Sequence, residues 1–151
     1  MFQILKKRRL NDSMTQMTVA APYVAQKAQA GQFIILRVNE YGERIPLTIA
    51  DYDREQGTVD IIFQKVGKTT LLLDTLEEGE AILDFIGPLG KPSELEGYQY
   101  AAVIGGGAGC AIAYPQAKAL HAMGTKVDMI AGFRNKDIII LEEEMRAASH
   151  N

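Results

Sequence analysis

The chain has 151 residues, enough for one domain or two small ones, and its 47% hydrophobic and 23% charged residues are ordinary for a globular protein. Its net charge of −3 argues against a nucleic-acid-binding protein, which would carry a basic face. The local basic run Lys6–Arg9 alternates into a strand pattern and is interpreted as a solvated strand face.

Cys110 is the only cysteine, so the chain can form neither an internal disulfide nor a cysteine-based metal site. A reducing, cytoplasmic location fits this usage. Residues 1–10 lack the apolar core and the small-residue cleavage site of a signal peptide. No apolar run approaches the roughly 20 residues that a membrane span needs, so we expect no membrane span.

The first part of the chain alternates between short β-patterned segments and turn residues. This pattern predicts six strands, at 2–10, 14–20, 33–38, 44–50, 58–66 and 81–86. Short helices are expected at 22–28 and 68–76. Six short strands with turns between them favour an all-β, six-stranded antiparallel barrel, because a barrel leaves no exposed strand edges.

The segment 87–92, Gly-Pro-Leu-Gly-Lys-Pro, interrupts this pattern. Two prolines and two glycines so close together predict neither a strand nor a helix. We therefore place a boundary between this segment and Gly97, and expect one domain at 1–96 and another at 97–151.

After the boundary, strand and helix patterns alternate. Strands are expected at 100–104 and 126–131 and helices at 111–123 and 138–148, the first ended by Gly124 and the second capped by Asp137. Alternation of this kind predicts a parallel sheet with right-handed crossovers. Two such units make a partial α/β nucleotide-binding domain with open sheet edges, about half the usual size, so the C-terminal part is expected to be missing.

The turn between the first of these strands and its helix is rich in glycine, at Gly105, Gly106, Gly107 and Gly109. A turn in this position lets backbone N–H groups and a helix N-terminus meet a pyrophosphate. The spacing departs from the G-x-G-x-x-G pattern because Cys110 stands at its last position. A tight glycine turn without a ligand is the alternative interpretation.

The second strand of this part is followed by Arg134 and Lys136 rather than by an acidic residue. This positive pair fits a ribose 2′-phosphate and fits a solvated loop equally well. Cys110 could be a nucleophile at a helix N-terminus, but neither His121 nor His150 is placed as its base, so a packing role is favoured.

The segment Arg44–Ala50 carries an arginine, a proline and a threonine in an otherwise apolar strand. Proline belongs at a strand edge or a bulge, and an arginine beside such an irregularity suits a phosphate. The Thr48 hydroxyl could reach a flavin ring nitrogen. Gly67–Thr70 opens a helix after a strand and offers a second phosphate-compatible feature.

Four motifs in this order resemble the ferredoxin–NADP reductase superfamily. They are Arg44-x-Pro46-Leu47-Thr48, Gly67-Lys68-Thr69-Thr70, Gly87-Pro88-Leu89-Gly90 and Gly105-Gly106-Gly107-Ala108-Gly109. Within the superfamily, the segments Ile45–Asp51 and Tyr114–Leu120 especially resemble the group of small subunits found in NADH-dependent ferredoxin–NADP oxidoreductase, sulfide dehydrogenase and dihydroorotate dehydrogenase. The resemblance extends over essentially the whole chain.

The resemblance implies an FAD-binding barrel followed by an NAD(P)-binding domain, with hydride transfer between NAD(P)H and the flavin and one-electron transfer onward. The cofactor-binding candidates are Arg44, Pro46, Leu47, Thr48, Phe63, Gly67, Lys68, Thr69, Thr70, Gly87, Gly105, Gly106, Gly107, Gly109 and Arg134. No residue is assigned a directly catalytic role.

Members of this group also carry a cysteine-bound [2Fe–2S] cluster, which needs four cysteine ligands, whereas Cys110 stands alone here. The expected partners are a larger flavin/iron–sulfur subunit and ferredoxin. Two alternatives stay open: a non-catalytic interaction or oligomerisation module that uses its open sheet edges, and a nucleotide sensor that binds phosphate without redox activity.

Overall fold

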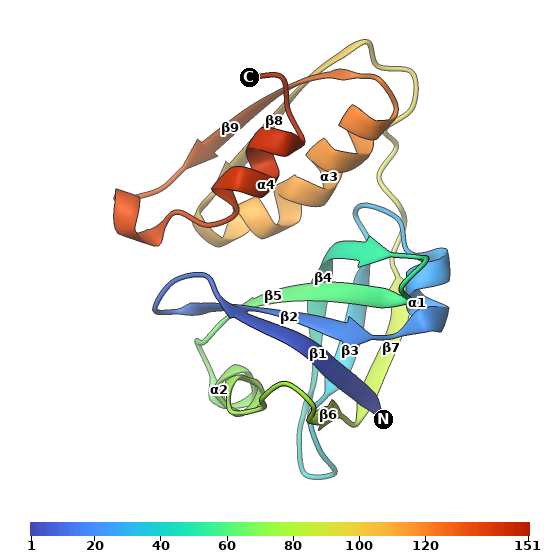
Figure 1. The fold of residues 1–151 in the computed structure, drawn as a ribbon, viewed down its shortest axis with the longest axis vertical. Coiled ribbons are helices and arrows are strands. Elements are labelled where there is room, and N and C mark those ends of the chain that lie inside the picture. Colours follow the sequence, from blue (N-terminus) through green and yellow to red (C-terminus); the bar gives the residue numbers. More distant parts are fainter.

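A computed structural model describes residues 1–151, with the first part of the chain forming a strongly curved antiparallel sheet (Figure 1). Its seven strands lie in the order β6-β1-β2-β5-β4-β3-β7. Their bounds are β1 Phe2–Arg9, β2 Met14–Ala20, β3 Phe33–Arg37, β4 Arg44–Asp53, β5 Thr58–Gln64, β6 Ala81–Ile82 and β7 Asp84–Leu89. Helix α1 spans Pro22–Lys27 and α2 spans Lys68–Asp74, close to the positions expected from the sequence.

The expectation of six strands was wrong by one, because the predicted strand 81–86 divides at Leu83. Its first part, β6, pairs with β1, and its second part, β7, pairs with β3. β6 and β7 lie at opposite ends of the strand order, so this division brings the two ends of the sheet together and nearly closes the barrel. A periodic sequence pattern identifies extended residues, but it cannot show that a strand changes partners midway.

The predicted break at Gly87–Pro88 was also wrong, because β7 continues through both residues to Leu89. β7 is a terminal strand of the sheet order, where a proline without an N–H is tolerated. Its pairing with β3 shifts register between Phe33 and Ile35, opposite this dipeptide. Proline and glycine are therefore accommodated by a local irregularity at the edge of the sheet.

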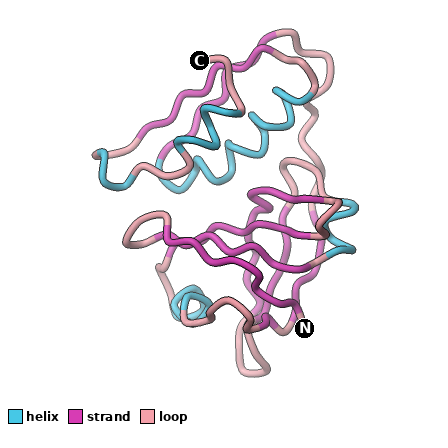
Figure 2. The backbone as a smooth tube through the Cα atoms, viewed as in Figure 1, coloured by secondary structure: helices cyan, strands magenta, loops and turns pink.

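The second part of the chain forms a two-stranded parallel sheet covered by helices (Figure 2). Its elements are β8 Tyr100–Gly106, a 3₁₀ turn at Gly107–Gly109, α3 Cys110–Ala122, β9 Lys126–Gly132, a second 3₁₀ turn at Lys136–Ile138 and α4 Glu142–Ala147. Gly124 ends α3 with a φ of +85°, as predicted. No helix is long and apolar enough to cross a membrane.

The last predicted helix is much shorter than expected, and its cap was wrongly assigned. α4 has only 6 residues and begins at Glu142, after Leu141 in the left-handed region with a φ of 57°. Asn135, rather than Asp137, caps the preceding 3₁₀ turn by accepting a hydrogen bond from the Asp137 backbone N–H. The isoleucine run 138–140 is β-branched and disfavours a helix, and Ile140 is buried instead in the core.

Two hydrophobic clusters hold the molecule together, and the second one joins its two parts. The first fills the barrel with inward-facing strand residues such as Ile34, Ile61 and Phe63. The second packs helix α3 against Met14, Ala50 and Ile62 of the barrel strands. Figure 1 shows α3 and α4 lying between the β8–β9 sheet and the barrel. The expected boundary near Gly97 falls in the loop between β7 and β8, although the core continues across it.

Candidate functional site

The first half of β4 presents three of the candidate residues on the outside of the barrel. Ile45 and Leu47 pack against the barrel core. Arg44, Pro46 and Thr48 alternate with them and therefore lie on the opposite face. Leu47 thus supports the strand from within, while the other three candidates of this motif face outward.

This same half of β4 lacks a neighbour on one side. Residues 44–48 are paired with β3, whereas the pairing of β4 with β5 begins at Ile49 and continues to Asp53. β5 pairs with β2 along its whole length, but on its β4 side it is paired only from Thr58 to Ile61. The sheet is therefore open between residues 44–48 of β4 and the end of β5. Backbone N–H and C=O groups on an open edge seek hydrogen-bond partners, so this edge can receive a ligand.

Arg37 of β3 and Arg44 of β4 share one carboxylate and place positive charge at the start of β4. Arg37 donates from Nε to Asp84 Oδ2 over 2.8 Å, and Arg44 donates from Nη2 to the same oxygen over 3.3 Å. The Arg44 side chain is 55% exposed and makes the longer contact. Two guanidinium groups on one carboxylate leave an excess positive charge, so Arg44 can contact an anion.

Helix α2 begins close to Arg44. The Thr69 hydroxyl lies 3.5 Å from Glu43 Oε2, and Glu43 immediately precedes Arg44. The Thr70 hydroxyl accepts hydrogen bonds from the backbone N–H groups of Val66 and Gly67, each over 3.0 Å. This cap fixes the turn that opens the helix. The structure thus brings together two motifs, Arg44–Thr48 and Gly67–Thr70, that are separated in sequence.

The other end of α2 is tied to the barrel by Asp74. Its carboxylate accepts a 2.6 Å hydrogen bond from the Thr15 hydroxyl of β2 and lies 3.5 Å from Lys65 Nζ. Burial by itself would raise the pKa of Asp74, but the Thr15 hydrogen bond and the charges of Lys65 and Lys7 outweigh it and hold that pKa below its ordinary value. The helix is therefore fixed at both ends.

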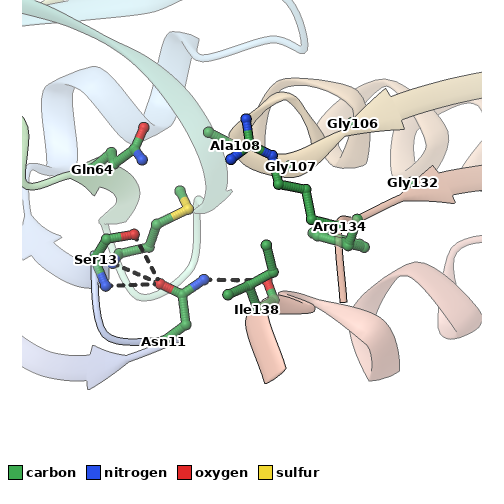
Figure 3. Close-up of a pocket in the computed structure, with 11 residues that line it drawn as sticks. Asn11, Ser13, Gln64, Gly106, Gly107, Ala108, Gly132, Arg134 and Ile138 are labelled. Carbon is green, nitrogen blue, oxygen red and sulfur yellow. Dashed lines mark hydrogen bonds between the residues drawn. The ribbon is translucent and has the colours of Figure 1, made fainter. Parts of the chain in front are cut away.

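A cavity of about 550 Å³ lies between the barrel and the α/β part (Figure 3). Gly106, Gly107 and Arg134 line it from the α/β side, and the Arg134 side chain extends toward the glycine turn. Asn11, Ser13 and Gln64 line it from the barrel side. The Asn11 amide donates to the Ile138 carbonyl over 3.2 Å and so bridges the two walls.

Sequence reasoning missed the barrel side of this cavity. In β5 the residues Val59, Ile61 and Phe63 point into the core, so their neighbours Ile62 and Gln64 point outward. Phe63 is only 2% exposed, and a side-chain role at a surface site does not fit the structure. The two-residue period of a strand would have identified Gln64 instead.

The local structure requires or permits glycine at the candidate positions for different reasons. A Cβ atom on Gly87 would lie 2.7 Å from Ile34 Cγ2, so Gly87 permits close packing of β7 on β3. A Cβ atom on Gly105 would lie 3.1 Å from the Cys110 sulfur, so Gly105 lets α3 approach β8. Gly107 has a φ of +53°, whereas Gly106 and Gly109 have open space around them. Packing accounts for Gly87 and Gly105, whereas Gly67, Gly106, Gly107 and Gly109 leave room for a ligand.

Cys110 plays the packing role that was expected. Its side chain is fully buried, and burial raises the pKa of its thiol. A raised pKa disfavours the thiolate, which is the reactive form. No group of three or more histidine, cysteine or acidic side chains is arranged to hold a metal ion.

Comparison with known proteins gives relatives along the whole chain, although no family model matches it. An uncharacterized protein from the adh 3′ region of Clostridium beijerinckii is 47% identical over 158 residues, which cover 100% of this chain and 53% of that protein. The homologue of the electron transfer subunit of dihydroorotate dehydrogenase B (NAD(+)) from Thermotoga maritima is 42% identical over 147 residues, covering 97% and 52%.

Solved structures show the same fold. The structure of an NADH-dependent reduced ferredoxin-NADP oxidoreductase, described for flavin-based electron bifurcation, superposes with a TM-score of 0.93 at 40% identity and covers 97% of this chain and 54% of that one. Phthalate dioxygenase reductase superposes with a TM-score of 0.81 over 95% of this chain and 46% of its own, at 16% identity, which speaks for the fold alone. The chain spans about half the length of these relatives.

Proposed function

Since the chain is homologous to the electron transfer subunits of dihydroorotate dehydrogenase B and has a ferredoxin reductase-like fold, we propose that it is the flavin-binding part of such a subunit. In this function it passes electrons between NAD(P)H and an iron–sulfur partner. The observation that carries the proposal is the open edge of β4 at residues 44–48. This edge begins at Arg44 and lies beside the start of α2.

The residues at this edge fit an FAD molecule. Arg44 supplies a positive charge for the pyrophosphate, and Lys68 and Thr69 at the start of α2 supply backbone N–H groups beside it. Pro46 and Thr48 lie on the same outer face of β4 as Arg44, where the flavin ring would rest. The unpaired backbone of residues 44–48 can donate to and accept from the ring edge.

The nicotinamide dinucleotide is assigned to the cavity between the two parts. Gly106 and Gly107 offer backbone N–H groups for its pyrophosphate, and Arg134 offers a charge for its phosphates. Gln64 and Ser13 orient the ligand from the barrel side. When bound, FAD supplies the hydride acceptance that the protein itself cannot provide, and the chain's own residues hold the two cofactors together. Residues 1–96 then form the flavin domain and residues 97–151 the beginning of the nucleotide domain.

These 151 residues cannot hold the [2Fe–2S] cluster, because cluster ligation needs four cysteines, and Cys110 is the only cysteine and is buried. The proposed partners are a larger flavin/iron–sulfur subunit and ferredoxin.

The test is the visible spectrum of the purified protein, followed by titration with FAD. The proposal predicts a yellow protein, or a colourless one that takes up FAD, and a flavin band that NADH or NADPH bleaches. Arg44→Ala serves as the comparison variant, because it removes the proposed charge without touching the cavity. A protein that never takes up FAD would contradict the proposal.

A second candidate function, an interaction module, is favoured by one observation. The face of the β8–β9 sheet turned away from α3 exposes Tyr100, Ile104 and Ile130, each by more than half. This candidate predicts a stable oligomer that forms without flavin. Size-exclusion chromatography with light scattering of the colourless protein distinguishes the two, because a cofactor-free monomer contradicts the interaction module.

A further inference from the structure

Helix α3 contacts the barrel through one stripe of side chains. Ala111, Tyr114 and Lys118 recur at the spacing that places residues on one helix face. Ala111 and Tyr114 belong to the cluster that also holds Ala50 of β4 and Ile62 of β5. Small Ala111 allows the close approach, and Lys118 follows at the end of the stripe nearer the C-terminus of the helix. The helix that begins at the glycine turn is thus seated directly on β4.

Lys118 meets Asp51, which belongs to the same strand as Arg44 and Thr48. Its ammonium nitrogen donates to both carboxylate oxygens of Asp51, over 2.7 Å and 2.8 Å. The Tyr114 hydroxyl donates to Asp51 Oδ2 over 3.4 Å. The Lys118 side chain is 50% exposed and that of Asp51 is 27% exposed. Two side chains of α3 therefore converge on one carboxylate of the barrel.

The charges where α3 meets β4 and β5 favour a cation at Lys118. Asp51 lies directly opposite Asp60 in the pairing of β4 with β5. Two carboxylates opposite each other on neighbouring strands repel. Burial raises the pKa of Asp60, and the charge of Asp51 adds to this rise, whereas hydrogen bonds from Thr18 and Gln16 and, to a smaller extent, the charge of Lys118 lower it. Lys6 and Arg8 of β1 line a small pocket with Asp60, and Arg8 also pairs with Glu144 of α4 over 3.4 Å.

We propose that Lys118 and Asp51 are a positioning pair that sets the separation between the flavin-binding strand β4 and the nucleotide-binding glycine turn. This inference rests on the proposed function. β4 carries Thr48 at the proposed ring position shortly before Asp51, and α3 carries the glycine turn at its start, before Lys118. Because a strand and a helix are stiff, a contact between Asp51 and Lys118 fixes the distance between the two cofactor sites.

An exposed ion pair adds little to stability, but position matters greatly for transfer between two bound groups. Surface pairs contribute about 0–1 kcal/mol to folding, whereas misplacement of reacting groups by about 1 Å can slow a reaction on the order of 100-fold. Loss of the pair is therefore expected to affect the rate of flavin reduction far more than folding or FAD affinity.

The test compares K118M with K118R and with the parent protein, using the intact, flavin-loaded form. In K118M, hydrogen exchange of backbone amides in α3 and in residues 49–53 is expected to rise by roughly 5-fold, the factor that corresponds to the upper end of an exposed pair. The rate of flavin reduction by NADH is expected to fall between roughly 10-fold and 100-fold. The FAD dissociation constant is expected to stay within about twofold, and K118R is expected to recover both measurements.

D51N provides the second variant, because it removes the ion pair and also one of the two facing carboxylates. Its effect on exchange is expected to be smaller than that of K118M, and the double variant D51N/K118M should resemble D51N. Unchanged exchange and reduction rate in K118M would overturn the positioning pair, as would a D51N effect larger than that of K118M. A parent protein that binds no FAD would instead overturn the proposed function. The exchange data would still decide whether the ion pair holds α3 against β4.

Discussion

Arg44 is the residue on which the flavin proposal can be tested most directly. Replacement by alanine removes a charge-assisted contact, for which losses of about 1.5–3 kcal/mol are typical. The FAD dissociation constant of Arg44→Ala is therefore expected to rise by roughly 10- to 100-fold, measured by quenching of flavin fluorescence. Arg9→Ala is the matched control, because Arg9 is an exposed arginine of β1 that lines a pocket beside Thr15 and Asp74, at the other end of α2. Equal affinities for the two variants would contradict the placement of the pyrophosphate at Arg44.

Cys110 provides a test with the opposite expectation. Since the thiol is buried and its pKa is raised, Cys110 in the folded protein should react slowly with a thiol reagent and rapidly after unfolding. Cys110→Ala should leave FAD binding unchanged. Rapid labelling of the native protein, or loss of electron transfer with flavin still bound, would show that the packing interpretation is incomplete.

At the scale of elements, the attachment of α2 to the barrel depends on the charge of Asp74. A carboxylate whose pKa is lowered in the folded state stabilises that state above its unfolded pKa, near the ordinary value of 3.8. This contribution is lost as the pH falls below 3.8 through the folded pKa. Asp74→Asn should therefore be less stable than the parent protein at neutral pH, and the difference should shrink in strong acid, as measured by urea unfolding at several pH values. A pH-independent difference would contradict the role of the charge.

The elements also show which features a sequence can reveal. Strand positions, the short helices and the glycine turn were predictable because they depend on local periodicity and on turn residues. The division at Leu83 was not, because it depends on which distant strands are available for pairing. The prediction of a helix at 138–148 was wrong for a related reason, because burial of Ile140 in the shared core outweighed the local pattern. At the site, the motifs identified β4 and the glycine turn, and the strand period could have identified Gln64, whereas the role of Asp51 depends on how the two parts meet.

At the scale of the whole molecule, the shared core predicts cooperative unfolding. Ile62 belongs to a barrel strand but packs with α3, and it is 8% exposed. Ile62→Ala is expected to cost about 2–5 kcal/mol, as for other large-to-small core substitutions. Far-ultraviolet circular dichroism should show a single transition that moves to lower temperature, because both parts lose the same packing. Two separate transitions, only one of which moves, would show that barrel and α/β part unfold independently.

The open edge of β4 has a consequence for the protein without its cofactor. An unpaired strand edge is a template for strands of other molecules and is the usual starting point of aggregation. Under the proposed function, FAD covers the edge at residues 44–48 that β5 leaves free. The flavin then protects the protein against self-association, and the flavin-free form is the one that must be shielded while it folds in the cell.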